Sequence, residues 1–187
     1  MLRVARFARA AAGVRPAVAA ASRLSTTQRT MSAHAREGWI VVEETGASRY
    51  QNRISDGRHE TLADEPGTFD GGCDTGMNPY GFLLSALGTC TNMTMRMYAT
   101  RENIPLERSR VFVKHGRTWA KDCDECHSTS GRVDVIEMDV ELEGANLTDE
   151  HRKKLMKIAN SCPVHKTMTT ETLVHVNEFK DEAVEQS

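Results

Sequence analysis

Between residues 78 and 101 the sequence reads NPYGFLLSALGTCTNMTMRMYATR, and this stretch has the period of a helix. From residue 79 to residue 101 one stripe repeats every three or four positions: Leu83, Leu87, Cys90, Thr94 and Met97. Further apolar side chains lie off this stripe: Phe82, Leu84, Met93 and Met95. A helix that is apolar on several sides usually lies at the centre of a fold, so we expect sheet or a partner subunit to surround it.

Strand-like segments precede this helix. Trp39-Ile40-Val41-Val42 is a short apolar run, and residues 49–62 have the pattern of two strands joined at Asp56-Gly57, a pair that favours a tight turn. We expect these segments to form an antiparallel meander. A loop rich in Gly and Asp then leads to the helix.

Two longer strands are predicted after the helix, over residues 106–118 and 132–142. In the second strand apolar residues alternate with acidic ones from Ile136 to Leu142, so one of its faces is dry and the other wet. The order of elements therefore predicts an α+β fold built on antiparallel strands.

A second helix is predicted to begin after Thr148, whose hydroxyl can cap it, and to end at Pro163. Leu155, Ile158 and Cys162 share its apolar stripe. Residues 171–176 alternate again and predict a closing strand. We expect a single domain over residues 38–178, followed by a tail over residues 179–187.

Composition limits the partners of the protein. The 187 residues are 39% apolar, enough to bury a core, and the longest apolar runs fall short of the ~20 residues that a membrane span requires. We therefore expect a soluble protein with no membrane partner. After the first 30 residues the chain carries 18 Lys and Arg against 26 Asp and Glu, a formal charge of −8. Such an acidic protein repels phosphate backbones, which argues against a nucleic-acid partner.

Residues 1–30 have the composition of an organellar transit peptide. They hold six arginines with several serines and threonines, and no acidic residue. As a helix they would place Val4 and Phe7 on one face and Arg3 and Arg6 on the other. The mitochondrial matrix is therefore the expected location, and a disordered basic tail is the alternative.

Five cysteines in an intracellular chain indicate reactivity or metal binding rather than a disulfide framework. Cys162 immediately precedes Pro163, which favours the first position of a helix, so Cys162 can be an N-cap at which backbone N–H groups stabilise a thiolate. His165 and Lys166 would add positive potential. Cys90 lies on the first helix, which could pack against the helix stripe that carries Cys162. Alternatively, each cysteine is a small core residue.

A separate motif reads Cys123-Asp124-Glu125-Cys126-His127. The same string attaches c-type haem, and the two thiols could also begin a zinc site or form a redox pair. The acidic neighbours raise the pKa of a thiol and disfavour a redox thiolate, whereas a divalent metal tolerates them. Haem would need an apolar pocket, which a polar loop between strands does not offer. A metal site and a loop dithiol without a catalytic role both stay open.

The 78–91 stretch, together with Cys162-Pro163-Val164-His165, resembles the OsmC/Ohr family of thiol-dependent hydroperoxide reductases. The resemblance spans residues 39–176 and is closest to the OsmC-like branch. It includes three further motifs and the 122–126 loop: Gly57-Arg58-His59, Ala63-Asp64-Glu65-Pro66 and Gly71-Gly72. The resemblance implies an OsmC-like fold in which antiparallel sheets wrap around central helices in an intertwined homodimer, with a site at the subunit interface.

The resemblance also implies the chemistry. Cys90 would attack the O–O bond of an organic hydroperoxide and become a sulfenic acid, and Cys162 would condense with it to a disulfide. A dithiol such as dihydrolipoamide, or a lipoyl-bearing protein, would then reduce the disulfide, and no bound cofactor is expected. In the family an arginine stabilises the thiolate. Arg49 is the nearest match to that arginine, and Arg53 is the alternative.

One position departs from the family pattern. Peroxidase members carry a glutamate that orients the arginine directly after Asn-Pro, whereas Tyr80 and Gly81 follow here. Glu65, Asp70 or Asp74 could supply the carboxylate from the preceding loop. The resemblance as a whole implies a thiol peroxidase in defence against oxidative stress. The alternative is a non-enzymatic module that binds a metal at the Cys-x-x-Cys-His loop or a small apolar ligand.

Overall fold

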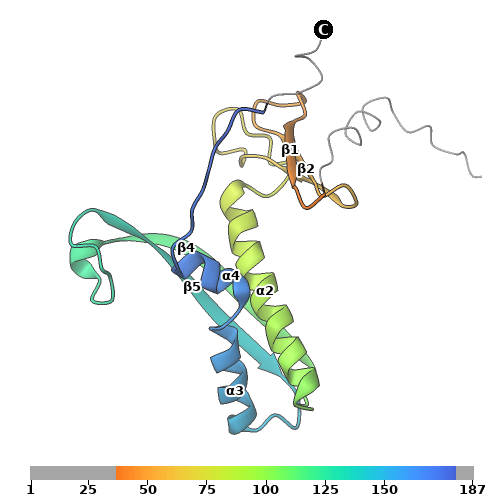
Figure 1. The fold of residues 1–187 in the computed structure, drawn as a ribbon, viewed down its shortest axis with the longest axis vertical. Coiled ribbons are helices and arrows are strands. Elements are labelled where there is room, and N and C mark those ends of the chain that lie inside the picture. Colours follow the sequence, from red (N-terminus) through yellow and green to blue (C-terminus); the bar gives the residue numbers. More distant parts are fainter. Residues whose placement is uncertain (1–36, 180–187) are drawn as a thin grey trace, which may run out of the picture.

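A computed structural model describes residues 37–179, which form a small sheet, a long β-hairpin and three α-helices (Figure 1). The small sheet lies near the N-terminal end of helix α2, and the hairpin lies along the side of the helix. The expected import signal over residues 1–30 lies outside the described residues. Within residues 37–179, no helix combines the length and the apolar character needed to cross a membrane.

The predicted N-terminal meander is confirmed. It consists of β1 (Val41–Glu44), β2 (Asn52–Ser55) and β3 (Glu60–Ala63), which pair antiparallel in that order. The turn between β2 and β3 is held by the Asp56 carboxylate, which accepts hydrogen bonds from the backbone N–H groups of Arg58 (2.8 Å) and His59 (2.6 Å). Gly57 in this turn has a φ of +85°, a conformation that strains any residue with a side chain.

The loop between β3 and α2 is tied together at its two ends. Ala63 forms a parallel bridge with Met77, next to the start of α2. The buried Asp64 accepts a hydrogen bond of 2.8 Å from the Thr75 hydroxyl, and such bonds hold the pKa of this carboxyl below its usual value despite burial. These contacts fix the small sheet beside the first turn of the helix.

Helix α2 (Pro79–Arg101) has the predicted boundaries. Asn78 caps it, since its side chain accepts a hydrogen bond of 2.8 Å from the Gly81 N–H, and Pro79 takes the first helical position. Gly88 allows the hairpin to approach, because a Cβ at this position would lie 3.1 Å from a Val113 methyl carbon.

The apolar stripe predicted for α2 does not coincide with the face of the helix that is buried. The buried residues follow a spacing of four: Leu87, Thr91, Met95 and Ala99. Met97, which the prediction placed on the stripe, is 64% exposed. The difference arises at Thr91, which counts as polar in the sequence but is fully buried, because its hydroxyl finds a partner on another helix.

Strands β4 (Arg108–Trp119) and β5 (Arg132–Glu143) confirm the two longer predicted strands and pair antiparallel along their whole length. The face toward α2 carries directly opposed apolar pairs, such as Val113 with Met138. The outer face carries ion pairs, among them Lys114 with Glu137 at 2.8 Å. The wet and dry faces predicted for β5 are both present.

Helix α3 (Asp149–Ala159) is capped by Thr148 as predicted, and His151 completes a capping box. The core lies where α2, α3 and the hairpin meet. Its members are Met95, Ala99, Ile104, Leu106, Leu142, Leu155 and Ala159. Cys162 does not share the α3 stripe, but it caps the next helix, α4 (Pro163–Thr169), which confirms the predicted N-cap.

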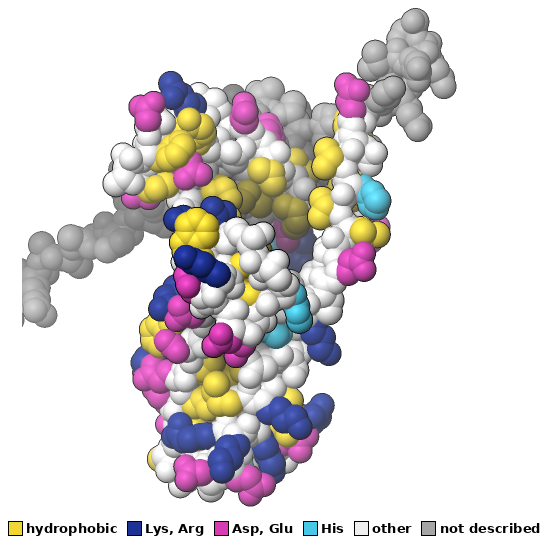
Figure 2. Space-filling model, turned by 90° about the vertical axis from the view of Figure 1, so that its left-hand side faces the viewer, with side chains coloured by type: hydrophobic (Ala, Val, Ile, Leu, Met, Phe, Trp, Pro, Cys, Tyr) yellow, Lys and Arg dark blue, Asp and Glu magenta, His cyan; other side chains and the backbone are white. Residues whose placement is uncertain are grey.

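The closing strand predicted over residues 171–176 does not form. These residues lie along the molecule without regular structure, and their apolar side chains are exposed, Leu173 by 74% and Val176 by 91%. A strand requires a neighbouring strand to pair with, and none lies beside this segment in the described chain. Figure 2 shows hydrophobic side chains at the surface in several places, among charged ones.

We expect Leu155→Ala to lower the free energy of unfolding by about 2–5 kcal/mol, because it opens a cavity in the core. Leu155 has no exposed surface, whereas Met156, its neighbour on α3, is 39% exposed. The matched control Met156→Ala should therefore cost less than about 1 kcal/mol. Urea unfolding of both variants measures the difference, and equal losses would contradict the assignment of the core.

Candidate functional site

The structure brings Cys90 and Cys162 together. Cys90 lies in the middle of α2, and Cys162 is the N-cap of α4, which packs against α2. The Cys90 thiol is within hydrogen-bonding reach of the Cys162 sulfur. Two residues separated by 72 positions in sequence thus place their sulfur atoms side by side.

The Cys162 sulfur is surrounded by hydrogen-bond donors. It accepts bonds from the Thr91 hydroxyl and from the His165 backbone N–H, each at 3.3 Å, and from Cys90. Burial by itself would raise the pKa of the Cys162 thiol, but the hydrogen bonds from Thr91, His165 and Cys90 favour the thiolate and lower this pKa below its usual value. These hydrogen bonds therefore favour Cys162 in its thiolate form.

The two cysteines differ in access. Cys162 has no exposed surface, whereas Cys90 is partly exposed. A reagent from solution therefore reaches Cys90 first, and Cys162 reacts with whatever forms on Cys90. The third free cysteine, Cys73, is exposed in the loop before α2 and belongs to neither helix.

A cavity of about 590 Å³ lies between α2, α4 and the hairpin. Its apolar wall is formed by Leu83, Leu87, Ile136, Met138 and Met168, and polar side chains line the rest. Leu87 lies one helical turn before Cys90, and His165 one turn after Cys162. Neither cysteine lines the cavity, but each lies one helical turn from a residue that does, and the cavity has the size of a small organic ligand.

A polar cluster lies at the end of the cavity at the start of α2, where Tyr80, His115 and Asp134 line it; Arg117, which bonds to Asp134, does not line it. The Nε atom of Arg117 donates to Oδ1 of Asp134 at 2.8 Å, and Nε2 of His115 lies 2.8 Å from the same oxygen. Bonds from Arg117 and His115 hold the pKa of Asp134 below its usual value, and Asp134 raises the pKa of Arg117. The Tyr80 ring stacks on His115, with 4.5 Å between ring centroids.

Sequence reasoning missed this cluster. The pairing register of the hairpin would have predicted it, because this register places Arg117 directly opposite Asp134 on the face toward α2. Polar residues at the end of an otherwise apolar face indicate a site rather than a core, but the register is known only once the two strands are paired.

Arg49 lies in the loop between β1 and β2. Its Nη1 atom is 3.4 Å from Oδ2 of Asp70, and its guanidinium lies near the Tyr50 ring. Asp70 is one of the three carboxylates that the sequence offered as a partner for the arginine. The described contacts of Arg49 do not include Cys90. Arg53, the alternative, lies on β2.

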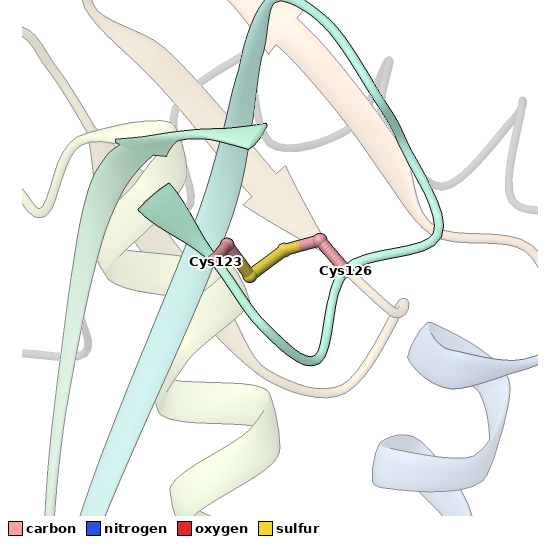
Figure 3. Close-up of a disulfide and its surroundings, with 2 residues drawn as sticks. All are labelled: Cys123 and Cys126. Carbon is pink, nitrogen blue, oxygen red and sulfur yellow. A yellow bond between two sulfur atoms is a disulfide. The ribbon is translucent and has the colours of Figure 1, made fainter. Parts of the chain in front are cut away.

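Cys123 and Cys126 form a disulfide at the tip of the hairpin, with their Cα atoms 5.5 Å apart (Figure 3). In this state neither sulfur is a thiolate, so the pair cannot bind zinc as thiolate ligands. His127 is exposed. Among residues 37–179, no three His, Cys, Asp or Glu side chains are grouped in a way that could hold a metal ion.

Comparison with known proteins identifies similar chains. The sequence model of the OsmC-like protein family matches residues 71–177. No curated protein matches the sequence.

Solved structures similar to this chain share its fold at low sequence identity. A protein from Psychrobacter arcticus described as an osmotic stress induced and detoxification response protein is 17% identical, covering 68% of this chain and 85% of its own, with a TM-score of 0.53. An OsmC-like protein from Mycoplasma pneumoniae is 19% identical, covering 71% and 87%, with a TM-score of 0.51. An organic hydroperoxide resistance protein from Legionella pneumophila is 15% identical, covering 70% and 89%, with a TM-score of 0.50.

We expect Thr91→Val to raise the pKa of Cys162, because valine keeps the volume but removes one donor to the sulfur. At a fixed pH below that pKa, less of the Cys162 thiol is then ionised and the ultraviolet absorbance of its thiolate falls. Thiolate absorbance against pH, with a Cys162→Ser protein as the baseline, measures the shift. In the control Thr89→Val the lost hydroxyl bonds only to backbone carbonyls of α2, so the pH dependence of Cys162 ionisation should match that of the parent. Identical profiles for both variants would contradict the role of Thr91.

Proposed function

The chain belongs to the OsmC-like protein family, and from this premise we propose that it is a thiol-dependent peroxidase that reduces organic hydroperoxides. The observation that carries the proposal is the pair Cys90 and Cys162. One thiol is partly exposed, the other is buried with hydrogen bonds that favour its thiolate, and each lies one helical turn from a residue that lines a partly apolar cavity. This arrangement suits a reaction that begins on one sulfur and ends with a bond between the two.

The reaction begins with proton transfer within the pair. The Cys90 proton passes to Cys162, whose donors Thr91 and His165 have favoured its thiolate. The Cys90 thiolate then attacks the O–O bond of the hydroperoxide and becomes a sulfenic acid, and the alkoxide leaving group takes a proton from solvent and departs as the alcohol. The Cys162 sulfur attacks that sulfenic acid, and its proton leaves with the hydroxyl group as water. A dithiol such as dihydrolipoamide, free or on a lipoyl-bearing protein, restores both thiols and is itself oxidised to a disulfide.

The proposed assembly is a homodimer with the site at the subunit interface. Met93 is 65% and Met97 64% exposed on α2, and the unpaired segment over residues 171–176 exposes further apolar side chains. These surfaces support burial against a second copy. In the dimer we assign Arg49 of one subunit, positioned by Asp70, as the cation that stabilises the thiolate of Cys90 in the other.

The proposed role is defence against oxidative stress. The similar Legionella pneumophila protein is named for organic hydroperoxide resistance, and family membership extends this proposal to the present chain. The arginine-rich composition of residues 1–30 supports the mitochondrial matrix as its location.

One equivalent of an organic hydroperoxide should link Cys90 to Cys162, and Cys162→Ser should trap a sulfenic acid on Cys90, because the second sulfur is then missing. Peptide mapping with a sulfenic-acid probe measures both products. Cys73→Ser is the matched control and should still form the disulfide. Recovery of both thiols unmodified with the hydroperoxide unconsumed would refute the peroxidase and favour a module that only binds a ligand in the cavity.

Mixing two inactive variants tests the dimer and Arg49 together. We expect Arg49→Ala and Cys90→Ser each to lose turnover. If Arg49 acts across the interface, a mixed dimer has one intact site, so an equimolar mixture after subunit exchange should regain roughly a quarter of the parent activity. No recovery, with mixed dimers demonstrated by native mass spectrometry, would place Arg49 in the same subunit as its thiol or outside the site.

A further inference from the structure

The Cys123–Cys126 disulfide lies apart from the thiol pair on α2 and α4. It closes the loop at the tip of the hairpin, which projects away from the helices (Figure 1). Val113 approaches α2 at Gly88, and β4 continues from Val113 for six residues, to Trp119, before the loop begins. At about 3.3 Å per residue these six residues span about 20 Å. Within one subunit the disulfide is therefore too far from Cys90 to react with it.

The disulfide adds little to the cohesion of the hairpin. The two strands pair without interruption up to Trp119 and Arg132. Beyond this pair, the Ala120 N–H donates a hydrogen bond of 2.9 Å to the Gly131 carbonyl. The disulfide joins residues only three positions apart, and the stabilisation from a cross-link grows with the length of the loop that it closes. A purely structural role therefore explains this disulfide poorly.

The loop keeps its two cysteines accessible and close together. From residue 121 to residue 131 every residue is exposed except Cys123 and Cys126, which are partly exposed. Their Cα atoms are 5.5 Å apart, a normal distance for a disulfide. Backbone hydrogen bonds form the turn, from the Cys123 N–H to the Ala120 carbonyl at 3.3 Å and from the Cys126 N–H to the Cys123 carbonyl at 3.4 Å. Because these bonds do not involve sulfur, reduction leaves the two thiols in position to close again.

The charge of the loop favours some thiols over others. Asp122, Asp124 and Glu125 lie beside the two cysteines in sequence, and Lys121 is the one cation from residue 121 to residue 126, which gives this run a formal charge of −2. All four charged side chains belong to exposed residues. A thiol attacks a disulfide as its thiolate, which is an anion that these carboxylates repel. A carboxylate on the attacking molecule increases the repulsion, so the loop favours thiols that carry no acidic group.

We propose that Cys123 and Cys126 form a second redox-active site, which exchanges two electrons with small dithiols that carry no acidic group. One thiolate of the dithiol attacks a sulfur of the protein disulfide, whose S–S bond breaks as a mixed disulfide forms. The second thiol of the dithiol then displaces the protein sulfur. The dithiol leaves as a cyclic disulfide, and Cys123 and Cys126 each gain a proton. The reverse reaction closes the loop again. The inference does not rest on the proposed peroxidase function, because neither Cys90 nor Cys162 takes part.

The test compares dihydrolipoamide with dihydrolipoate, which has the same dithiol but carries a carboxylate. In the full-length protein at low ionic strength, dihydrolipoamide should open the Cys123–Cys126 disulfide about threefold faster, and this ratio should fall to about one in concentrated salt. Excess lipoamide should then close the disulfide again. Rapid alkylation followed by peptide mapping measures this disulfide by itself, so the result does not depend on whether the Cys90–Cys162 pair reacts.

A pair of matched variants tests the role of the charge. Asp124→Asn/Glu125→Gln leaves the run from residue 121 to residue 126 neutral, so the ratio should fall to about one. The control Glu137→Gln/Asp139→Asn removes the same charge from exposed positions on β5 and should keep the parent ratio. If the loop variant does not fold, Glu125→Gln alone should still lower the ratio.

Three results would overturn the inference. The first is a disulfide in the parent that neither dithiol opens. The second is a reduced loop that excess lipoamide does not close. The third is equal rates with the two dithiols in the parent, or a ratio that stays at the parent value when Asp124 and Glu125 are neutralised.

Discussion

The buried row on α2 constrains most of the described structure. Leu87, Thr91, Met95 and Ala99 are almost inaccessible, and the helix that carries them packs against β4, α3 and α4. Three of these residues are apolar, and the fourth, Thr91, can be buried only because its hydroxyl reaches the Cys162 sulfur. The contact that satisfies Thr91 therefore also fixes α4 on α2 and sets how close the two cysteines lie.

The reactive pair consequently belongs to the rigid part of the molecule rather than to its loops. Cys90 is held by a helix of 23 residues, and Cys162 is held at the junction of α3 and α4, directly beside the core. Sites on regular elements keep their geometry better than sites on loops. The cavity near the pair changes from apolar to polar along the hairpin, because its wall there changes from Met138 and Ile136 to Asp134 and His115.

Local patterns in the sequence predicted what depends on local interactions. The boundaries of α2 and the cap at Thr148 follow from side chains that bond to their own backbone neighbours, and β4 and β5 follow from alternation.

The buried face of α2 was misplaced because the burial of Thr91 depends on a residue 71 positions away. The segment over residues 171–176 has the alternation of a strand but lacks a neighbour to pair with. The contacts of Arg117 with Asp134 and of Arg49 with Asp70 are both long-range, and composition and periodicity do not encode them.

The long hairpin has a consequence for the behaviour of the chain in solution. β4 and β5 pair only with each other in the described residues, so each has an open edge of backbone N–H and C=O groups that could recruit another strand. On the outer face, on either side of the exposed Phe112, arginine and lysine of β4 bind glutamates of β5 across the pair. A strand approaching the edge would have to place its own side chains beside this charged ladder and strip it of water. The outer charges of the hairpin, which contribute little to the core, thus protect the protein from aggregation.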